Sequence, residues 1–107
     1  MNMKEIIYYK TINGKCPYLE WYTTLDKSVR LIIDRRIDRI KLGNLGKHRK
    51  FDNLTEIKFT EGAGYRIYAY EYDDIIIILL SAGDKSKQTK DINLAKKYLQ
   101  ELKERYK

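Results

Sequence analysis

The sequence predicts an α+β domain, and three observations support that fold class. Apolar residues recur at helical intervals in residues 26–43 and 89–106, whereas residues 54–80 alternate as strands do or run continuously apolar. Glycine and asparagine turn signals separate these segments. A chain of 107 residues builds one hydrophobic core. We therefore expect a single domain over residues 1–107, with the element order β-α-α-β-β-β-α.

The first elements are predicted to be a strand and a short helix. Residues 4–9 are rich in β-branched and aromatic types, and they end before the turn signal Asn13-Gly14. Pro17 suits the first turn of a helix because its missing N–H needs no partner there. Apolar residues at helical spacing then extend this helix to about Leu25.

Residues 26–43 carry the clearest helical pattern in the chain. Asp26 is predicted to cap the helix, and Gly43 to end it in the left-handed conformation. The apolar stripe consists of Val29, Ile32, Ile33, Ile37 and Ile40. The basic residues assigned to positions off this stripe are Arg30, Arg35, Arg36 and Arg39. Because acids are interspersed among them, a solvated helix surface is favoured over an RNA contact.

Residues 44–53 are predicted to form a surface loop, because turn-forming and charged residues dominate them. Four consecutive cationic or titratable residues lie in it: Lys47, His48, Arg49 and Lys50. Such a loop is placed to rim a phosphate site. His48, the only histidine, is the general-base candidate by residue type, although a lone loop histidine is more often simply solvated.

The segment 54–80 is predicted to form a three-stranded antiparallel meander. Alternation puts one set of side chains on the core side: Thr55, Ile57, Phe59, Tyr65, Ile67 and Ala69. It puts a second set on an open, solvated face: Glu56, Lys58, Arg66, Tyr68, Tyr70 and Tyr72. The Gly62–Gly64 turn joins the first two strands. The apolar run 75–80 needs cover on both sides, so it is expected to be the buried strand.

The C-terminal segment is predicted to be a helix that packs on the sheet or on a partner. Thr89 and Asp91 suit its first turn. Its apolar stripe consists of Ile92, Ala95, Leu99, Leu102 and Tyr106. Before it, Asp84 and Ser86 are typical turn residues that bond nearby amides.

Composition narrows the class of partner and the compartment. The net charge of +7 arises from 22 Lys and Arg against 15 Asp and Glu, which favours a phosphate-bearing partner. The single Cys16 cannot form an internal disulfide, and the longest apolar run is far too short to span a membrane. We expect a cytoplasmic protein that does not bind membranes. One His and one Cys leave no recognisable zinc site, so no cofactor is expected.

Three blocks of the sequence resemble the RelE/ParE toxin superfamily, and more narrowly its HigB-like addiction-module killer proteins, which are similar to phage host-takeover proteins. They are GNLG (43–46), LTEIKFTEGAGYRIYAY (54–70) and LLSAGDKSKQTKDINLAKKY (79–98). The resemblance runs nearly end to end and implies a RelE-like fold. Members commonly have Arg where this chain has Lys58, which keeps the charge but loses the planar fork of guanidinium.

The resemblance implies a toxin of a type II toxin–antitoxin system, a metal-independent endoribonuclease that cuts mRNA on the ribosome. The residues it marks as catalytic candidates are Arg66, Lys58 and Lys85. The RNA-binding candidates are Lys47, Arg49, Lys50, Tyr68, Tyr70, Lys87 and Gln88. A helix-turn-helix antitoxin is the implied partner, and DNA is contacted only through the toxin–antitoxin complex. The general base is left open.

Two other functions stay open at this point. One is a non-enzymatic inhibitor of a host protein such as DNA gyrase, and the other is an inactive relative that only binds nucleic acid or a partner chain. Single residues can also have purely structural roles. Arg66 can form an ordinary cross-strand pair, and Lys85 can be part of ordinary turn chemistry.

Overall fold

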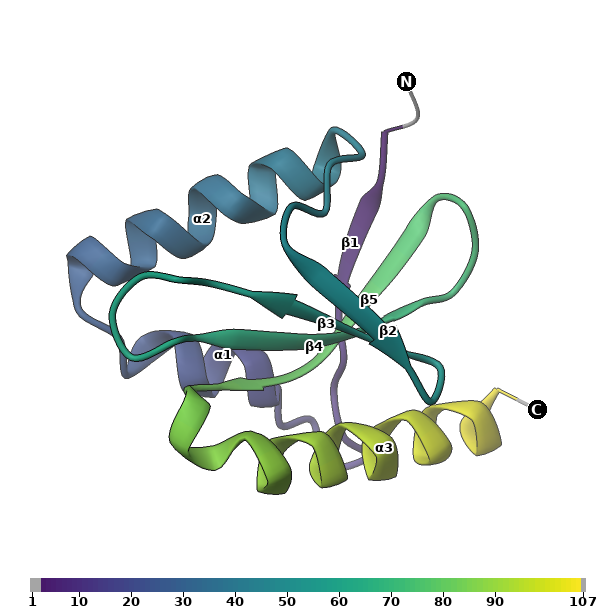
Figure 1. The fold of residues 1–107 in the computed structure, drawn as a ribbon. Helices are drawn as coiled ribbons and strands as arrows, with labels where there is room; N and C mark the ends of the chain where they lie inside the picture. The colour runs from purple at the N-terminus through teal and green to yellow at the C-terminus, as the bar shows by residue number, and fades with distance from the viewer. Residues whose placement is uncertain (1–2, 107) are drawn as a thin grey trace.

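The computed structural model describes residues 3–106 and has an α+β fold, in which a five-stranded mixed sheet lies between two helical layers (Figure 1). The strands are β1 (Glu5–Tyr8), β2 (His48–Phe51), β3 (Leu54–Lys58), β4 (Arg66–Glu71) and β5 (Ile76–Gly83). The α-helices are α1 (Pro17–Thr23), α2 (Lys27–Lys41) and α3 (Gln88–Arg105), with a 3-10 turn, η1 (Lys85–Lys87), before α3. The strand order is β1-β5-β4-β3-β2.

β5 is an interior strand, as its continuous apolar run predicted. It pairs in parallel with β1 and antiparallel with β4, while β3 pairs antiparallel with both β4 and β2. The predicted meander is therefore confirmed, and it is part of a larger mixed sheet. In the described part of the chain, no helix combines the length and the apolar character needed to cross a membrane.

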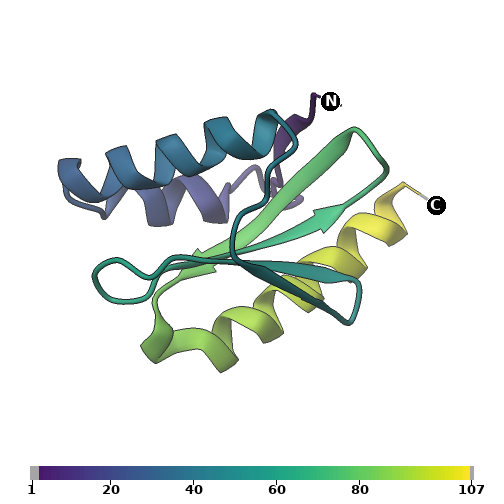
Figure 2. The same cartoon turned by 45° about the horizontal axis from the view of Figure 1, so that its top comes forward.

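The helices α1 and α2 cover one face of the sheet (Figure 2). The predicted core side of β3 and β4 packs here, with Ile57 and Ile67 both completely buried. The stripe of α2 is also confirmed, because Ile33, Ile37 and Ile40 are buried in the same cluster. Asp26 occupies the predicted N-cap position, although its side chain makes no capping hydrogen bond, and Gly43 follows the helix with a φ of +94°.

The opposite face of the sheet is covered by α3, so the prediction of an open face is wrong. Tyr68 is fully buried and packs in a second core cluster with Ala95 and Leu99. The apolar stripe of α3 needs a surface to bury, and this face of the sheet supplies it. The stripe ends earlier than predicted, since Tyr106 is 76% exposed.

Residues 48–51 form an edge strand, so the predicted surface loop is wrong there. Three of the four residues of β2 are exposed, which made the segment look like a loop. Exposed charged side chains are common on edge strands, where they discourage pairing with other chains. The β2–β3 reversal is tight, with Asp52 and Asn53 both at positive φ, of 50° and 65°.

A bulge in β5 lies next to a contact that holds the start of α3. The register with β4 shifts between Tyr68 and Ala69, so Leu80 and Ser81 both lie on the α3 side. Ser81 Oγ donates to the carbonyl oxygen of Asp91 at 3.1 Å. This contact anchors the first turn of α3 to the end of the sheet where β4 begins.

Candidate functional site

The candidate catalytic residues lie at the end of the sheet next to the Gly62–Gly64 turn. Arg66 is the first residue of β4, and it pairs with Lys58 of β3 on one side and Gly83 of β5 on the other. Directly opposite residues of an antiparallel pair project to the same face. Arg66 and Lys58 therefore share the α3 side of the sheet, and Glu56 shares it too, two residues before Lys58.

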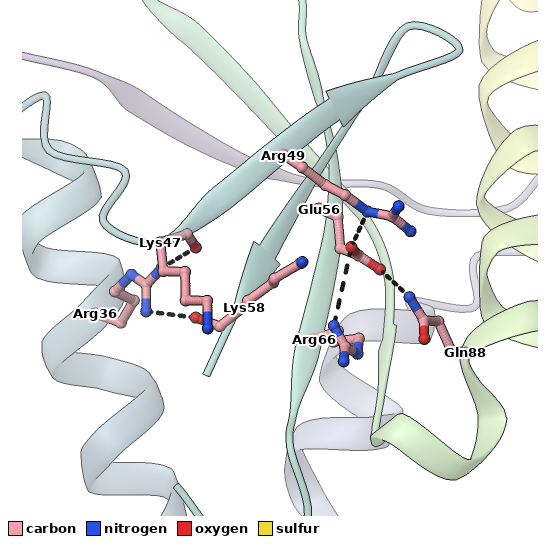
Figure 3. Close-up of polar contacts among 7 residues, drawn as sticks. All are labelled: Arg36, Lys47, Arg49, Glu56, Lys58, Arg66 and Gln88. Carbon is pink, nitrogen blue, oxygen red and sulfur yellow. Dashed lines mark hydrogen bonds and ion pairs between the residues drawn. The ribbon is translucent and has the colours of Figure 1, made fainter. Parts of the chain in front are cut away.

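Glu56 is the centre of the polar contacts at this site (Figure 3). Its side chain is fully buried, yet it meets donors from β2, β4 and α3. Arg49 Nε lies 2.5 Å from Glu56 Oε1, Gln88 Nε2 donates to Oε2 at 2.9 Å, and Arg66 NH1 is 3.9 Å from Oε1. One carboxylate thus connects three other elements of the fold.

The surroundings keep Glu56 ionised. Burial alone would raise the pKa of its carboxyl, but hydrogen bonds from Arg49 and Gln88 outweigh burial and lower that pKa below its usual value. The pKa of Tyr68 is raised, first by burial and then by the negative charge of Glu56. At neutral pH the site therefore contains a buried carboxylate and a protonated phenol beside two arginines.

Arg66 keeps most of its hydrogen-bonding capacity. Its contact with Glu56 is at 3.9 Å, beyond hydrogen-bond length, and its buried Nε has no hydrogen-bond partner among residues 3–106. The side chain is 14% exposed, so it is less open than predicted. A guanidinium offers donors in a planar fork that matches the oxygens of a phosphate group. The site therefore holds a positioned cation that can accept an anionic ligand.

Lys85 lies beside the turn that precedes Arg66. Its backbone N–H donates to Ala63 O at 3.2 Å, and a Cβ built on Gly64 would lie only 3.3 Å from Lys85 Cβ. The side chain of Lys85 is exposed at the start of η1. The turn itself is held by Asp84, whose Oδ1 accepts from the N–H of Ser86 at 2.9 Å. The predicted role of Asp84 and Ser86 in the turn is thus confirmed.

Arg36 fixes the backbone on the other side of Lys58. It is buried, and it donates to the carbonyl oxygens of Leu45 at 3.0 Å, Lys47 at 2.6 Å and Lys58 at 2.9 Å. Its guanidinium also lies over the ring of Phe59, 4.9 Å from the centroid. The prediction that Arg36 lies on the helix surface is wrong. Its spacing contained a signal, because residues 33, 36, 37 and 40 follow one helical face.

The segment around β2 divides its basic residues between the two faces of the sheet. Arg49 lies opposite Glu56, while its neighbours His48 and Lys50 project to the other face. Lys50 Nζ pairs there with Glu71 at 3.0 Å. Lys47 is exposed just before the strand, and its carbonyl oxygen accepts from the N–H of Lys58 at 2.9 Å. Arg49 and Lys47 therefore join the site, whereas Lys50 and His48 do not.

Of the two tyrosines expected to stack on a base, Tyr68 is inaccessible and Tyr70 is half-buried. Tyr68 lies beneath α3 with no exposed surface. Tyr70 is one further pair along β4, where Lys103 of α3 lies 5.3 Å from its ring centroid. Gln88 is adjacent to the site, but its side-chain amide is engaged by Glu56. Lys87 is exposed in η1, next to Lys85.

The central role of Glu56 was missed by sequence reasoning. Strand alternation already placed it on the face of Arg66 and Lys58, which was the available signal. Its contact with Gln88 joins residues 32 positions apart and depends on where α3 packs. Within residues 3–106, the structure brings together no group of three or more His, Cys, Asp or Glu side chains that could hold a metal ion.

Comparison with known proteins places the chain in a family. An uncharacterized protein of Haemophilus influenzae (strain ATCC 51907 / DSM 11121 / KW20 / Rd) is 44% identical over 71 residues, which cover 65% of this chain and 72% of the relative. The chain belongs to the family of this Haemophilus protein. No protein-family model matches it, and no solved structure matches it at a significant level. Because the Haemophilus relative is itself uncharacterized, the functional argument depends on the site.

Proposed function

We propose that the chain is a HigB-like toxin of the RelE/ParE superfamily that cleaves mRNA on the ribosome. The observation that carries the proposal is the loosely paired guanidinium of Arg66, held 3.9 Å from the buried carboxylate of Glu56. The sequence resemblance marks the same residue, and the cations Lys58 and Lys85 lie on neighbouring segments. Together these features support a site for the backbone phosphate of RNA.

The proposed reaction is an internal transesterification of RNA. The ribose 2′-oxygen attacks the adjacent phosphorus, the bond from phosphorus to the 5′-oxygen breaks, and the products are a 2′,3′-cyclic phosphate and a free 5′-hydroxyl. Negative charge gathers on the phosphoryl oxygens in the transition state. Arg66 stabilises this charge bidentately, and Lys58 adds to the positive field from the paired position in β3.

Protons move at two points in this reaction. Lys85 Nζ gives a proton to the departing 5′-oxygen, or it holds a flanking phosphate. The proton of the 2′-hydroxyl passes to a base that the three cations do not supply. His48 is a poor candidate for that base, since strand alternation places it on the other face of the sheet from Arg49. The ribosome would present the message in the geometry required for in-line attack.

A cytoplasmic toxin of this kind would be neutralised by a helix-turn-helix antitoxin encoded with it, and the complex would repress its own operon. DNA is then contacted through the complex. This part of the proposal is supported by the sequence resemblance.

The function is tested by primer-extension mapping of a reporter mRNA in a reconstituted translation reaction. Wild type, Arg66→Ala and a reaction without ribosomes are compared. We expect cuts at codon-phased positions with wild type only, and only when ribosomes are present. An intact message, together with growth arrest on expression, would contradict the proposal and direct attention to a protein target such as DNA gyrase.

A further inference from the structure

A hollow rich in lysine lies beside the candidate site, on the outer side of η1 and the first three turns of α3. Four lysines line it: Lys85, Lys87, Lys90 and Lys97. No Asp or Glu is among the lining residues. Four like charges in one place repel one another in the free protein, so this surface favours an anionic partner.

The helical spacing explains why Lys90 and Lys97 face the same way. Residues 90, 93, 94 and 97 follow the i, i+3, i+4, i+7 pattern, so they form one stripe on α3. Asp91, Ala95 and Leu99 occupy the buried side of the same helix. From Lys90 to Lys97 the stripe spans about 10 Å along the helix axis, given a rise of ~1.5 Å per residue.

Of the two acids close to the hollow, only Asp91 is directed away from it. Asp84 is engaged with Ser86, and Asp91 is buried, with its Oδ2 only 1.9 Å from the position of a Cβ built on Gly83. Other lysines of α3 have partners elsewhere, since Lys96 Nζ pairs with Asp52 at 2.9 Å. Asp84 and Asp91 both interact electrostatically with Lys87, so they offset part of the positive charge, but none of the four lysines forms an ion pair among residues 3–106.

The hollow is continuous with the candidate site. Gln88 lines the hollow and also donates to Glu56, the carboxylate beside Arg66. Lys85 lines it too, and its backbone N–H bonds to the turn that precedes Arg66. A chain of phosphates that crosses Arg66 can therefore continue past Lys85 onto the stripe of α3.

We infer that this hollow binds the sugar–phosphate backbone of the single-stranded RNA that flanks the scissile phosphate, with Lys87, Lys90 and Lys97 as the contacts. The inference rests on the proposed function, because it assigns a path to the substrate of that site. Contacts of this kind are independent of base identity and release counterions, so they make binding strongly dependent on salt.

The test is a fluorescence-anisotropy titration with a short single-stranded 2′-O-methyl RNA at several salt concentrations. The hollow variant Lys87→Gln/Lys90→Gln/Lys97→Gln is compared with wild type and with a control variant, Lys15→Gln/Lys27→Gln/Lys41→Gln, which loses the same charge elsewhere. Each lost phosphate contact lowers the salt slope by ~0.7 for a single strand. We expect the hollow variant to lose about 2 in slope and to bind about 10- to 100-fold more weakly, and the control to behave as wild type.

Equal slopes and affinities in the hollow and control variants would overturn the inference, as would an equal loss with an RNA duplex of the same sequence. If the triple variant does not fold, Lys90→Gln/Lys97→Gln against Lys27→Gln/Lys41→Gln gives the same comparison with a slope change of about 1.4. The probe cannot undergo 2′-hydroxyl attack, so binding is measured independently of cleavage. A further outcome separates the two proposals. If wild type binds the probe and the hollow variant shows the expected loss of salt slope, but wild type does not cleave an unmodified message on the ribosome, the proposed function fails and the binding role of the hollow stands.

Discussion

Glu56 positions the side chains around Arg66 but forms no hydrogen bond with the Arg66 guanidinium. Arg49 and Gln88 make the short contacts to the carboxylate, at 2.5 and 2.9 Å, whereas Arg66 stays at 3.9 Å. The carboxylate therefore attracts the Arg66 guanidinium and leaves its donors for a ligand. A buried carboxylate with these partners is a positioning residue, since it has no surface through which to reach a substrate.

Replacing the carboxylate should measure that role. We expect Glu56→Gln to lower the free energy of unfolding by about 1–3 kcal/mol, because Arg49 and Arg66 lose their buried counter-charge. Urea denaturation monitored by circular dichroism gives the value. Glu61→Gln, at an exposed position of the neighbouring turn, is the matched control and should change stability by less than about 0.5 kcal/mol. A loss no larger than the control would show that the carboxylate is not structurally engaged.

The lowered pKa of Glu56 also predicts a pH dependence. A carboxyl whose pKa is lower in the folded state than its usual 4.5 stabilises the fold above that usual value, and the contribution is lost as pH falls through the folded pKa. Wild type should therefore lose stability below about pH 4.5 more steeply than Glu56→Gln. Glu71, whose pKa is also lowered, titrates in both proteins and cancels in the comparison. Parallel stability–pH curves from pH 7 to 3 would contradict this account.

Arg36 offers a second test at this scale. Arg36→Lys keeps the charge but cannot reach three carbonyl oxygens at once, so we expect a loss of about 2–4 kcal/mol in unfolding free energy. The adjacent Arg35 is exposed, and Arg35→Lys should stay within about 0.5 kcal/mol of wild type. Equal thermal midpoints for the two variants would show that the carbonyl contacts contribute nothing.

At the residue scale, part of the candidate site was predictable from the sequence. Strand alternation placed Glu56, Lys58 and Arg66 on one face, and the register confirms that arrangement. It did not foresee that Tyr68 is buried on this face, because the cover comes from α3, a distant segment. Arg36 was predicted to be exposed because arginine usually is, but its position belongs to the buried stripe of α2.

At the scale of elements, α3 and β2 each contribute side chains to the candidate site on the sheet face. β2 brings Arg49 opposite Glu56, and α3 brings Gln88 onto the same carboxylate. The boundaries of α2 were predictable from capping and glycine signals. β2 was not, since an edge strand buries little and its exposed charges resemble those of a loop.

The junction between β5 and α3 depends on Gly83. An added Cβ there would lie 1.9 Å from Asp91 Oδ2, so Gly83→Ala must displace the buried Asp91 carboxylate from its position. We expect a loss of about 1–3 kcal/mol. In an Asp91→Ala background the obstructing carboxylate is gone, and the same substitution should cost less. Chemical denaturation of the four proteins of this double-mutant cycle measures the coupling; strictly additive losses would mean that the close approach is not what constrains Gly83.

Over the whole molecule, the fold gathers cationic side chains at one end of the sheet. The fold class and the interior position of β5 were predictable from periodicity alone. The parallel pairing of β1 with β5 joins segments about 70 residues apart, as in Glu5 with Ile76, and no local pattern specifies it. The cationic site depends on other contacts, which are the pairing of β3 with β4, the bond from Lys85 to Ala63, and the packing of α3 on the sheet.

The claim that Arg66 catalyses RNA cleavage is tested most directly by single-turnover cutting of an end-labelled message in programmed ribosomes. Wild type, Arg66→Ala and the exposed-site control Arg35→Ala are compared, and the fragment ends are identified. We expect Arg66→Ala to be slower by about 100-fold or more, the control to match wild type, and the fragments to carry a 2′,3′-cyclic phosphate and a 5′-hydroxyl. Wild-type rates in Arg66→Ala, or a free 3′-hydroxyl on the upstream fragment, would contradict the proposed mechanism.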